Sequence, residues 1–350
     1  MFDYSKVCFE DDKSHRDTYM DGILSMLARR KLESAAVRAS FMTPEKLCGN
    51  PELYRARYIE MLGWPLNEYT HEYAPRTQKR LVGDYGFLKV YRLQIEIFEN
   101  LWFGGILYEP ALRKNPAPLL IVNHGGGGRP DDLIKKAADD SGVYKNVAGR
   151  CVERGAVVFA PQYEVWTDEP LVSNPATRQK LNIQFKAMGG SIGAFEIYCV
   201  RRAIDFLIGE PGIDRERIGM MGLSYGGFYT LYASAAETRI KAAYASCFFN
   251  DRFGSDERPE SYREDWLWRD SALTFFDAEV SALIAPRPLY IECGKRDFLF
   301  DAATAECEYR RLKPFYDCVG AGDKLVFALA ECSHEMSDGD EGIDFVLHSI

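Results

Sequence analysis

The sequence predicts an α/β fold in which helices flank a mostly parallel sheet. Short, continuous apolar runs follow one another along the chain, at residues 117–122, 156–160 and 218–221. Runs of this kind are typical of strands buried on both faces, as in a parallel sheet. Segments with helical periodicity separate them, and this alternation of strands and helices favours an α/β architecture.

The composition of the 350-residue chain suits a globular enzyme. Apolar residues make up 47% and aromatic residues 13%, which supports a large core and argues against disorder. The formal net charge of −9 argues against a nucleic-acid or anionic membrane surface. No signal-peptide pattern opens the chain, and no apolar run reaches the roughly 20 residues of a membrane helix. The nine cysteines form no C-x-x-C pair, which favours free thiols in the cytoplasm over disulfides or a zinc site.

Residues 1–80 are expected to form a helical extension. Apolar residues recur at helical spacing within residues 17–39. A second helix is expected to begin after Thr43 as its N-cap, and a third to run over 51–62 until Gly63 ends it. We expect this extension to pack on the main domain or to form a contact between two copies of the chain.

Residues 81–350 are expected to form one catalytic domain. Alternation with a period of two after Leu88 predicts an antiparallel hairpin ahead of the parallel strands. Irregular stretches at about 161–190 and 248–276 are expected to form the pocket walls, the second as a short cap. Further helices are expected at 131–154, 192–208, 227–236, 302–318 and the C-terminus.

The motif that organises this domain is Gly222-Leu-Ser-Tyr-Gly226, which follows the apolar run 218–221 and precedes a helical segment. Gly-x-Ser-x-Gly between a strand and a helix is the nucleophile elbow, which exposes a serine hydroxyl on a tight turn. Glycines on either side let neighbouring elements approach without a Cβ clash. The alternative interpretation is a glycine-rich turn that carries no chemistry.

A nucleophilic serine needs a base, and the base needs an acid that orients it. Asp297 and His334 follow Ser224 in the chain order expected for this kind of elbow. Each lies just beyond a predicted strand, so all three are expected on loops at the carboxyl edge of the sheet. Asp301 is the rival candidate for the acid.

Four consecutive glycines, 125–128, follow the buried run 117–122. Glycine backbone can pass close to a substrate and turn its N–H groups toward an oxyanion. No Gly-Lys-Ser/Thr follows, which excludes a P-loop, and the spacing of a dinucleotide-binding motif is absent. We therefore expect an oxyanion loop rather than an ordinary flexible one, with His124 as its structural anchor and not as a base.

Together these motifs resemble the α/β-hydrolase superfamily over about residues 85–350. The segment 214–219, the Gly-x-x-Asp turn that ends at Asp297 and the His-Glu pair at His334 are similar to the dienelactone-hydrolase and acetyl-xylan-esterase-like branch. The resemblance implies Ser224 as nucleophile, His334 as base and Asp297 as its partner.

The resemblance also implies which groups hold the oxyanion and whether a cofactor is needed. Its donors are the backbone N–H of Tyr225 and one N–H among Gly125, Gly126 and Gly127. No metal and no organic cofactor is implied.

The function predicted from these residues is hydrolysis of a carboxylic ester, of a small acylated sugar or a similar small molecule, through an acyl-enzyme. The same triad would serve an amidase, a peptidase or a hydrolase of carbon–carbon bonds. A hydrolase fold can also serve a non-catalytic binding protein. A broken triad would indicate that class, and the presence of all three members argues against it.

Overall fold

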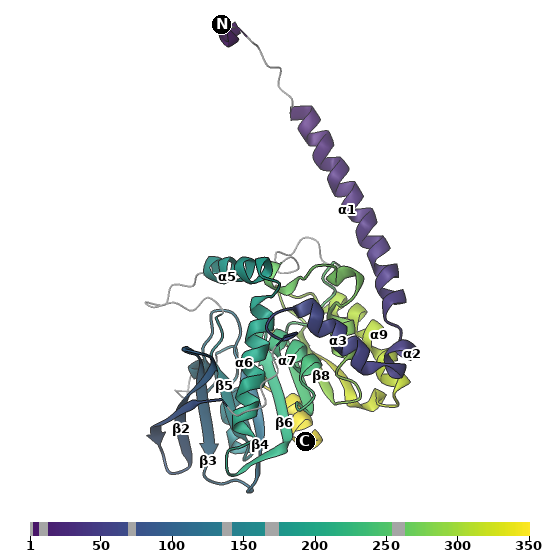
Figure 1. Cartoon of the computed structure of the whole chain (residues 1–350). Coiled ribbons are helices and arrows are strands. Elements are labelled where there is room, and N and C mark those ends of the chain that lie inside the picture. Colours follow the sequence, from purple (N-terminus) through teal and green to yellow (C-terminus); the bar gives the residue numbers. More distant parts are fainter. Residues whose placement is uncertain (1–2, 7–12, 69–74, 135–141, 165–174, 254–262) are drawn as a thin grey trace.

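The computed structural model describes residues 3–6, 13–68, 75–134, 142–164, 175–253 and 263–350. Within these ranges a nine-stranded sheet runs through the body of the molecule, with helices on both faces (Figure 1). The strand order is β1-β2-β3-β5-β4-β6-β7-β8-β9. The three pairings that involve β1, β2 and β3 are antiparallel, and the remaining five are parallel.

The described elements alternate as an α/β chain should. The strands are β1 (Thr77–Asp84), β2 (Leu88–Phe98), β3 (Leu101–Pro110), β4 (Ala117–Asn123), β5 (Val157–Pro161), β6 (Ile213–Leu223), β7 (Ala242–Ser246), β8 (Leu289–Gly294) and β9 (Leu325–Ala330). The helices are α1 (Lys13–Phe41), α2 (Pro44–Gly49), α3 (Pro51–Leu62), α4 (Val147–Glu153), α5 (Pro175–Ala187), α6 (Ile192–Leu207), α7 (Tyr225–Ala236), α8 (Asp277–Ala282), α9 (Ala302–Cys318) and α10 (Glu341–Ser349).

Side chains of the central strands alternate between two hydrophobic cores. In β4, Leu119 and Ile121 face the core that α3, α6, α7, α8 and α9 cover, whereas Leu120 and Val122 face the core under α4 and α10. A strand with a core on each side has no polar face. This is why its sequence is a continuous apolar run.

The structure confirms the α/β fold and most of the predicted elements. The hydroxyl of Thr43 accepts the N–H of Lys46 at 3.3 Å and caps α2 as expected. Gly63 ends α3 with a φ of 84°, a left-handed conformation that glycine adopts without strain. The antiparallel hairpin after Leu88 is β2 and β3.

Three expectations about secondary structure are wrong. The sheet begins at β1, so strand structure starts inside the range 1–80 that was expected to be helical. In 131–154, the described residues form a short 3-10 turn, 130–133, and α4 rather than one long helix. The irregular range 161–190 contains α5, whose sequence has no clear apolar stripe because its buried face carries Arg178 and Asn182.

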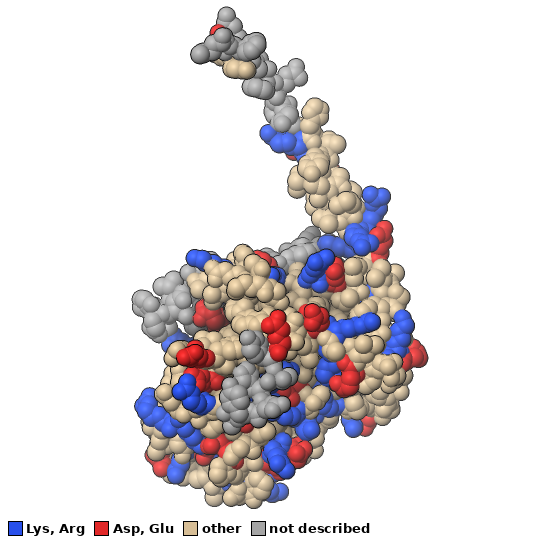
Figure 2. All heavy atoms as spheres, viewed as in Figure 1, with Lys and Arg blue, Asp and Glu red and all other residues tan. Residues whose placement is uncertain are grey.

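Helix α1 projects from the body of the molecule (Figure 1). It has 29 residues and is therefore about 43 Å long. Only its C-terminal end docks: Arg38 donates to the carbonyl of Ala272 at 2.6 Å and pairs with Glu279 at 3.3 Å. Figure 2 shows the rest standing clear, where Met20 and Leu24 are more than half exposed. The prediction that two copies meet through this segment stays a prediction.

Candidate active site

Ser224 lies on a strained turn between β6 and α7. Its φ of 59° and ψ of −119° are unusual for a residue with a side chain and cost on the order of 1–3 kcal/mol. A Cβ on Gly226 would lie 2.3 Å from the carbonyl oxygen of Asn123, and one on Gly222 would lie 2.6 Å from the backbone of Gly226. The turn can therefore close only with glycine at both positions, which is what an elbow requires.

His334 and Asp297 form a hydrogen-bonded pair at the carboxyl ends of β9 and β8. His334 Nδ1 lies 2.9 Å from Asp297 Oδ2. Asp297 Oδ1 accepts the backbone N–H groups of Leu299 (2.8 Å) and Phe300 (3.1 Å). Because a carboxylate only accepts, we assign the proton of the neutral ring to Nδ1, which leaves a lone pair on Nε2.

The environment of Asp297 keeps its carboxyl ionised. Burial raises its pKa, but the hydrogen bond and charge of His334 and the two backbone N–H groups outweigh burial, so that the pKa lies below its ordinary value. Asp301, the rival acid, is used elsewhere: its Oδ2 accepts the N–H of Thr304 at 3.0 Å and caps α9. The structure thus brings Asp297 to the histidine.

The end of β7 lies between the serine and the histidine. The N–H of Ser224 donates to the carbonyl of Ser246 at 2.9 Å. The next residue, Cys247, is buried, and its thiol lies 3.8 Å from the carbonyl of Ser333 and 3.5 Å from that of Glu335, on either side of His334 in the chain. One strand end therefore contacts both the elbow and the loop of the histidine.

The glycine loop 125–128 runs directly against the nucleophile, since a Cβ on Gly125 would lie 3.3 Å from Ser224 Cβ. The three glycine N–H groups predicted as oxyanion donors differ in whether they already have a partner. The N–H of Gly125 donates to the hydroxyl of Tyr144 at 2.8 Å, so this group is already engaged. Gly126 and Gly127 remain as glycine candidates. Tyr225 opens α7, where the helix's own hydrogen bonds do not use the N–H groups.

The comparisons with known proteins agree with this architecture. The sequence profile of the Prolyl oligopeptidase family matches residues 187–274, which include the elbow. A protein of Bacillus subtilis (strain 168) described as a hydrolase, YtaP, is 23% identical over 219 residues, 61% of this chain and 72% of that protein.

Two solved structures share the fold. A glucuronoyl esterase from Solibacter usitatus has a TM-score of 0.63 at 13% identity, covering 87% of this chain and 93% of its own. Acetyl xylan esterase 1 from Thermoanaerobacterium sp. JW/SL YS485 has a TM-score of 0.55 at 14% identity, covering 85% and 93%. The chain has an α/β-hydrolase fold. The predicted fold class is thereby confirmed.

Within this fold, His124 anchors the glycine loop. It is fully buried, and its Nε2 accepts the N–H of Tyr163 at 3.1 Å, so that Nδ1 donates to the carbonyl of Gly125 at 2.9 Å. Burial lowers the pKa of His124 to about 4. The ring is therefore neutral and committed at both nitrogens, which agrees with the structural role expected for it.

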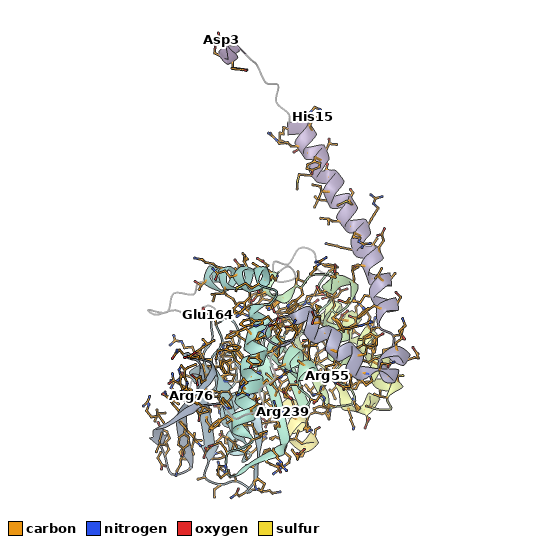
Figure 3. The ribbon with its side chains drawn as sticks, viewed as in Figure 1. Asp3, His15, Arg55, Arg76, Glu164 and Arg239 are labelled. Atoms are coloured by element: carbon orange, nitrogen blue, oxygen red, sulfur yellow. The ribbon has the colours of Figure 1, made fainter. Side chains whose placement is uncertain are left out.

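Two of the other histidines lie away from the site. His15 is at the outer end of α1, far from the body (Figure 3), and His348 is exposed on α10. His71 falls outside the described residues.

A buried ionic network contacts α7, the helix that follows the elbow, and the sequence analysis did not predict it. Arg178 on α5 is fully buried and pairs with Asp265 at 2.6 Å and with Glu196 at 2.9 Å. The hydroxyl of Tyr225, next to the nucleophile, donates to the same Asp265 at 2.7 Å. Glu164, labelled in Figure 3, donates its N–H to Glu196 at 2.7 Å. The network ties α5, α6 and α7 together around the turn.

Sequence reasoning also missed Cys247 and Tyr144. Cys247 could have been found, because it directly follows the apolar run of β7 and therefore lies at the same sheet edge as the serine. No local pattern pairs Tyr144 with Gly125, because the two residues are 19 positions apart in the sequence.

Proposed function

We propose that this α/β-hydrolase cleaves a carboxylic ester through an acyl-enzyme on Ser224. The observation that carries the proposal is the hydrogen bond between His334 Nδ1 and Asp297 Oδ2, which leaves Nε2 as a base at the sheet edge where Ser224 sits. A glycine loop against the serine and the start of α7 supply N–H groups for an oxyanion.

In the proposed reaction, each of these residues has one role. Ser224 Oγ attacks the ester carbonyl while His334 Nε2 takes its proton, and the ionised Asp297 stabilises the imidazolium that forms. His334 then gives the proton to the leaving alcohol, which departs and leaves the acyl group on Ser224. Water activated by His334 hydrolyses this acyl-enzyme in a second addition and collapse.

The substrate that the site supports best is a small acylated sugar or a similar small ester. Aromatic rings flank the base: the ring centroid of Phe300 lies 5.7 Å from that of His334, and Phe298, which is 69% exposed, lies at 6.0 Å. Phe300 is buried against the histidine, whereas the exposed ring of Phe298 can stack on the apolar face of a sugar. The names of the structural relatives, an acetyl xylan esterase and glucuronoyl esterases, support the same substrate class.

A second candidate function is hydrolysis of a peptide bond. The match to the Prolyl oligopeptidase family over residues 187–274 favours it, because acyl transfer to serine serves amides as well as esters. Turnover of aminoacyl p-nitroanilides at a kcat/KM above that of matched p-nitrophenyl esters would establish the peptidase and displace the esterase.

The experiment that tests the esterase is hydrolysis of p-nitrophenyl acetate, butyrate and octanoate. Ser224→Ala is expected to lower kcat by about 10⁶-fold, as loss of the nucleophile does in serine hydrolases. Ser333→Ala removes a neighbouring hydroxyl that only donates to the carbonyl of Arg296, and it should stay within a few-fold of wild type. An unchanged rate in Ser224→Ala would overturn the proposal.

We place this activity in the cytoplasm. The eight cysteines that the structure describes are all free thiols, as a reducing compartment permits. None of the described helices has the length and apolar composition needed to span a bilayer.

A further inference from the structure

A thiol, a carboxylate and an imidazole lie close together at the carboxyl edge of the sheet. The thiol of Cys247, a carboxylate oxygen of Asp297 and a ring nitrogen of His334 all lie within 4.8 Å of one another. They come from the ends of β7, β8 and β9, three neighbouring strands. Cys247 and Asp297 are buried, and His334 is partly accessible.

This combination of ligands is the one that zinc prefers. Zn²⁺ binds thiolate sulfur, imidazole nitrogen and carboxylate oxygen in a tetrahedral arrangement, with bonds of about 2.3, 2.0 and 2.1 Å. Those bond lengths place the ligand atoms about 3.3 to 3.6 Å apart. The cluster spans at most 4.8 Å, and its His334–Asp297 pair is 2.9 Å apart, so side-chain shifts of about 1 Å would suffice.

The backbone of Cys247 sets the position of its thiol. Cys247 takes a positive φ of 49°, which turns it out of the line of β7, and its N–H donates to the carbonyl of Glu292 at 2.8 Å. Its sulfur lies 3.5 Å and 3.8 Å from the two carbonyls beside His334 and also shares a hydrogen bond with the thiol of Cys332. Coordination would therefore cost only hydrogen bonds that involve sulfur, which are weak.

We propose that Cys247, Asp297 and His334 form an inhibitory Zn²⁺ site. The binding is inferred from the geometry alone, whereas the inhibition rests on the proposed hydrolase function. A soft or borderline divalent ion suits the thiolate, and Mg²⁺ and Ca²⁺, which require oxygen ligands, do not.

Binding would remove the base by displacing its proton. Zn²⁺ takes the place of the hydrogen on Nδ1, and that hydrogen moves to Nε2, so that the imidazole stays neutral. One proton leaves, from the Cys247 thiol. The positive ion on Nδ1 withdraws electron density from the ring, and Asp297 now neutralises the metal instead of stabilising an imidazolium. Nε2 can then no longer accept the proton of Ser224.

A second thiol provides a matched control. Cys332 is buried near by, and its thiol donates to the same carbonyl of Glu335, at 3.4 Å. It is outside the group of three that could hold an ion. Because the thiol of Cys332 contacts that of Cys247, its replacement by serine tests whether losing the neighbouring thiol alone changes the response to zinc.

The test measures zinc binding and inhibition separately on the full chain. Zinc content after equilibrium dialysis against ZnCl₂ is expected to be one ion per wild-type chain, with X-ray absorption showing one Zn–S distance of about 2.3 Å. Ester hydrolysis should fall as zinc is added and recover with EDTA. Cys247→Ala and Cys247→Ser, each normalised to its own zinc-free rate, should need roughly 100-fold more zinc for half-inhibition, and Cys332→Ser should match wild type.

The outcomes separate the two claims. Equal inhibition of wild type and both Cys247 variants would overturn the site, as would the absence of a Zn–S distance in wild type. Bound zinc with a sulfur ligand that is lost in Cys247→Ser, in a chain that hydrolyses no ester, would uphold the site and refute the proposed function.

Discussion

Replacing Asp297 with asparagine should strongly lower the activity while leaving the fold intact, because the two side chains have the same shape. The wild-type carboxylate holds three donors: the N–H groups of Leu299 and Phe300 on Oδ1 and His334 Nδ1 on Oδ2. An amide has one acceptor end only. With its oxygen kept on the two backbone donors, it presents its NH₂ to His334 and forces the ring proton onto Nε2, which then has no lone pair for the proton of Ser224.

The size of the activity loss can be estimated from the free energy needed to turn the amide the other way round. An amide turned to accept from His334 leaves the two backbone N–H groups facing an NH₂, and each unsatisfied donor costs about 1–3 kcal/mol. The active orientation is then disfavoured by about 2–6 kcal/mol, which corresponds to a loss of roughly 30-fold to 10⁴-fold. The upper end equals the loss of about 10⁴-fold known for this substitution in a serine protease triad.

The assay is kcat for p-nitrophenyl acetate, with circular dichroism to check the fold. Asp301→Asn is the matched control, because asparagine caps a helix as well as aspartate does, and it should stay within about twofold of wild type. The reasoning would be refuted by Asp297→Asn keeping activity within threefold of wild type, or by Asp301→Asn losing as much.

Two further predictions concern the elbow and the core. Gly226→Ala places a Cβ 2.3 Å from the carbonyl oxygen of Asn123, so it should abolish activity and lower the melting temperature, whereas Gly49→Ala, with nothing within 4 Å, should do neither. Burial raises the pKa of Glu308 to about 8 from an ordinary 4.5, so the folded state binds its proton more tightly, and stability should fall as pH rises between these values. The melting temperature measured as a function of pH should therefore change less in Glu308→Gln than in wild type, whereas Glu306→Gln should behave like wild type. An unchanged pH dependence in Glu308→Gln would contradict this prediction.

The sequence predicted the fold and the members of the candidate site because both depend on local patterns. The buried strands appear as continuous apolar runs, and the elbow is a contiguous motif whose glycines are dictated by contacts of under 3 Å. The chain order of Ser224, Asp297 and His334 identified the triad candidates, and proximity to a strand end favoured Asp297 over Asp301.

What the sequence could not predict depends on contacts between distant residues. Cys247 meets the loop of His334 across 88 residues, and Arg178 pairs with Asp265 across 87. Helix α5 escaped prediction because its buried face is polar and is stabilised by that ion pair. The engagement of the Gly125 N–H by the hydroxyl of Tyr144, which leaves Gly126 and Gly127 as candidates, also could not be predicted.

The most direct test of the central claim is to identify where a covalent serine-hydrolase probe attaches. After reaction with a fluorophosphonate, intact-mass and peptide measurements should show one adduct per chain, on the peptide that contains Ser224. Labelling should be absent in Ser224→Ala and much slower in Asp297→Asn, whose base is impaired. An unlabelled wild-type chain, or an adduct on any other residue, would contradict the account.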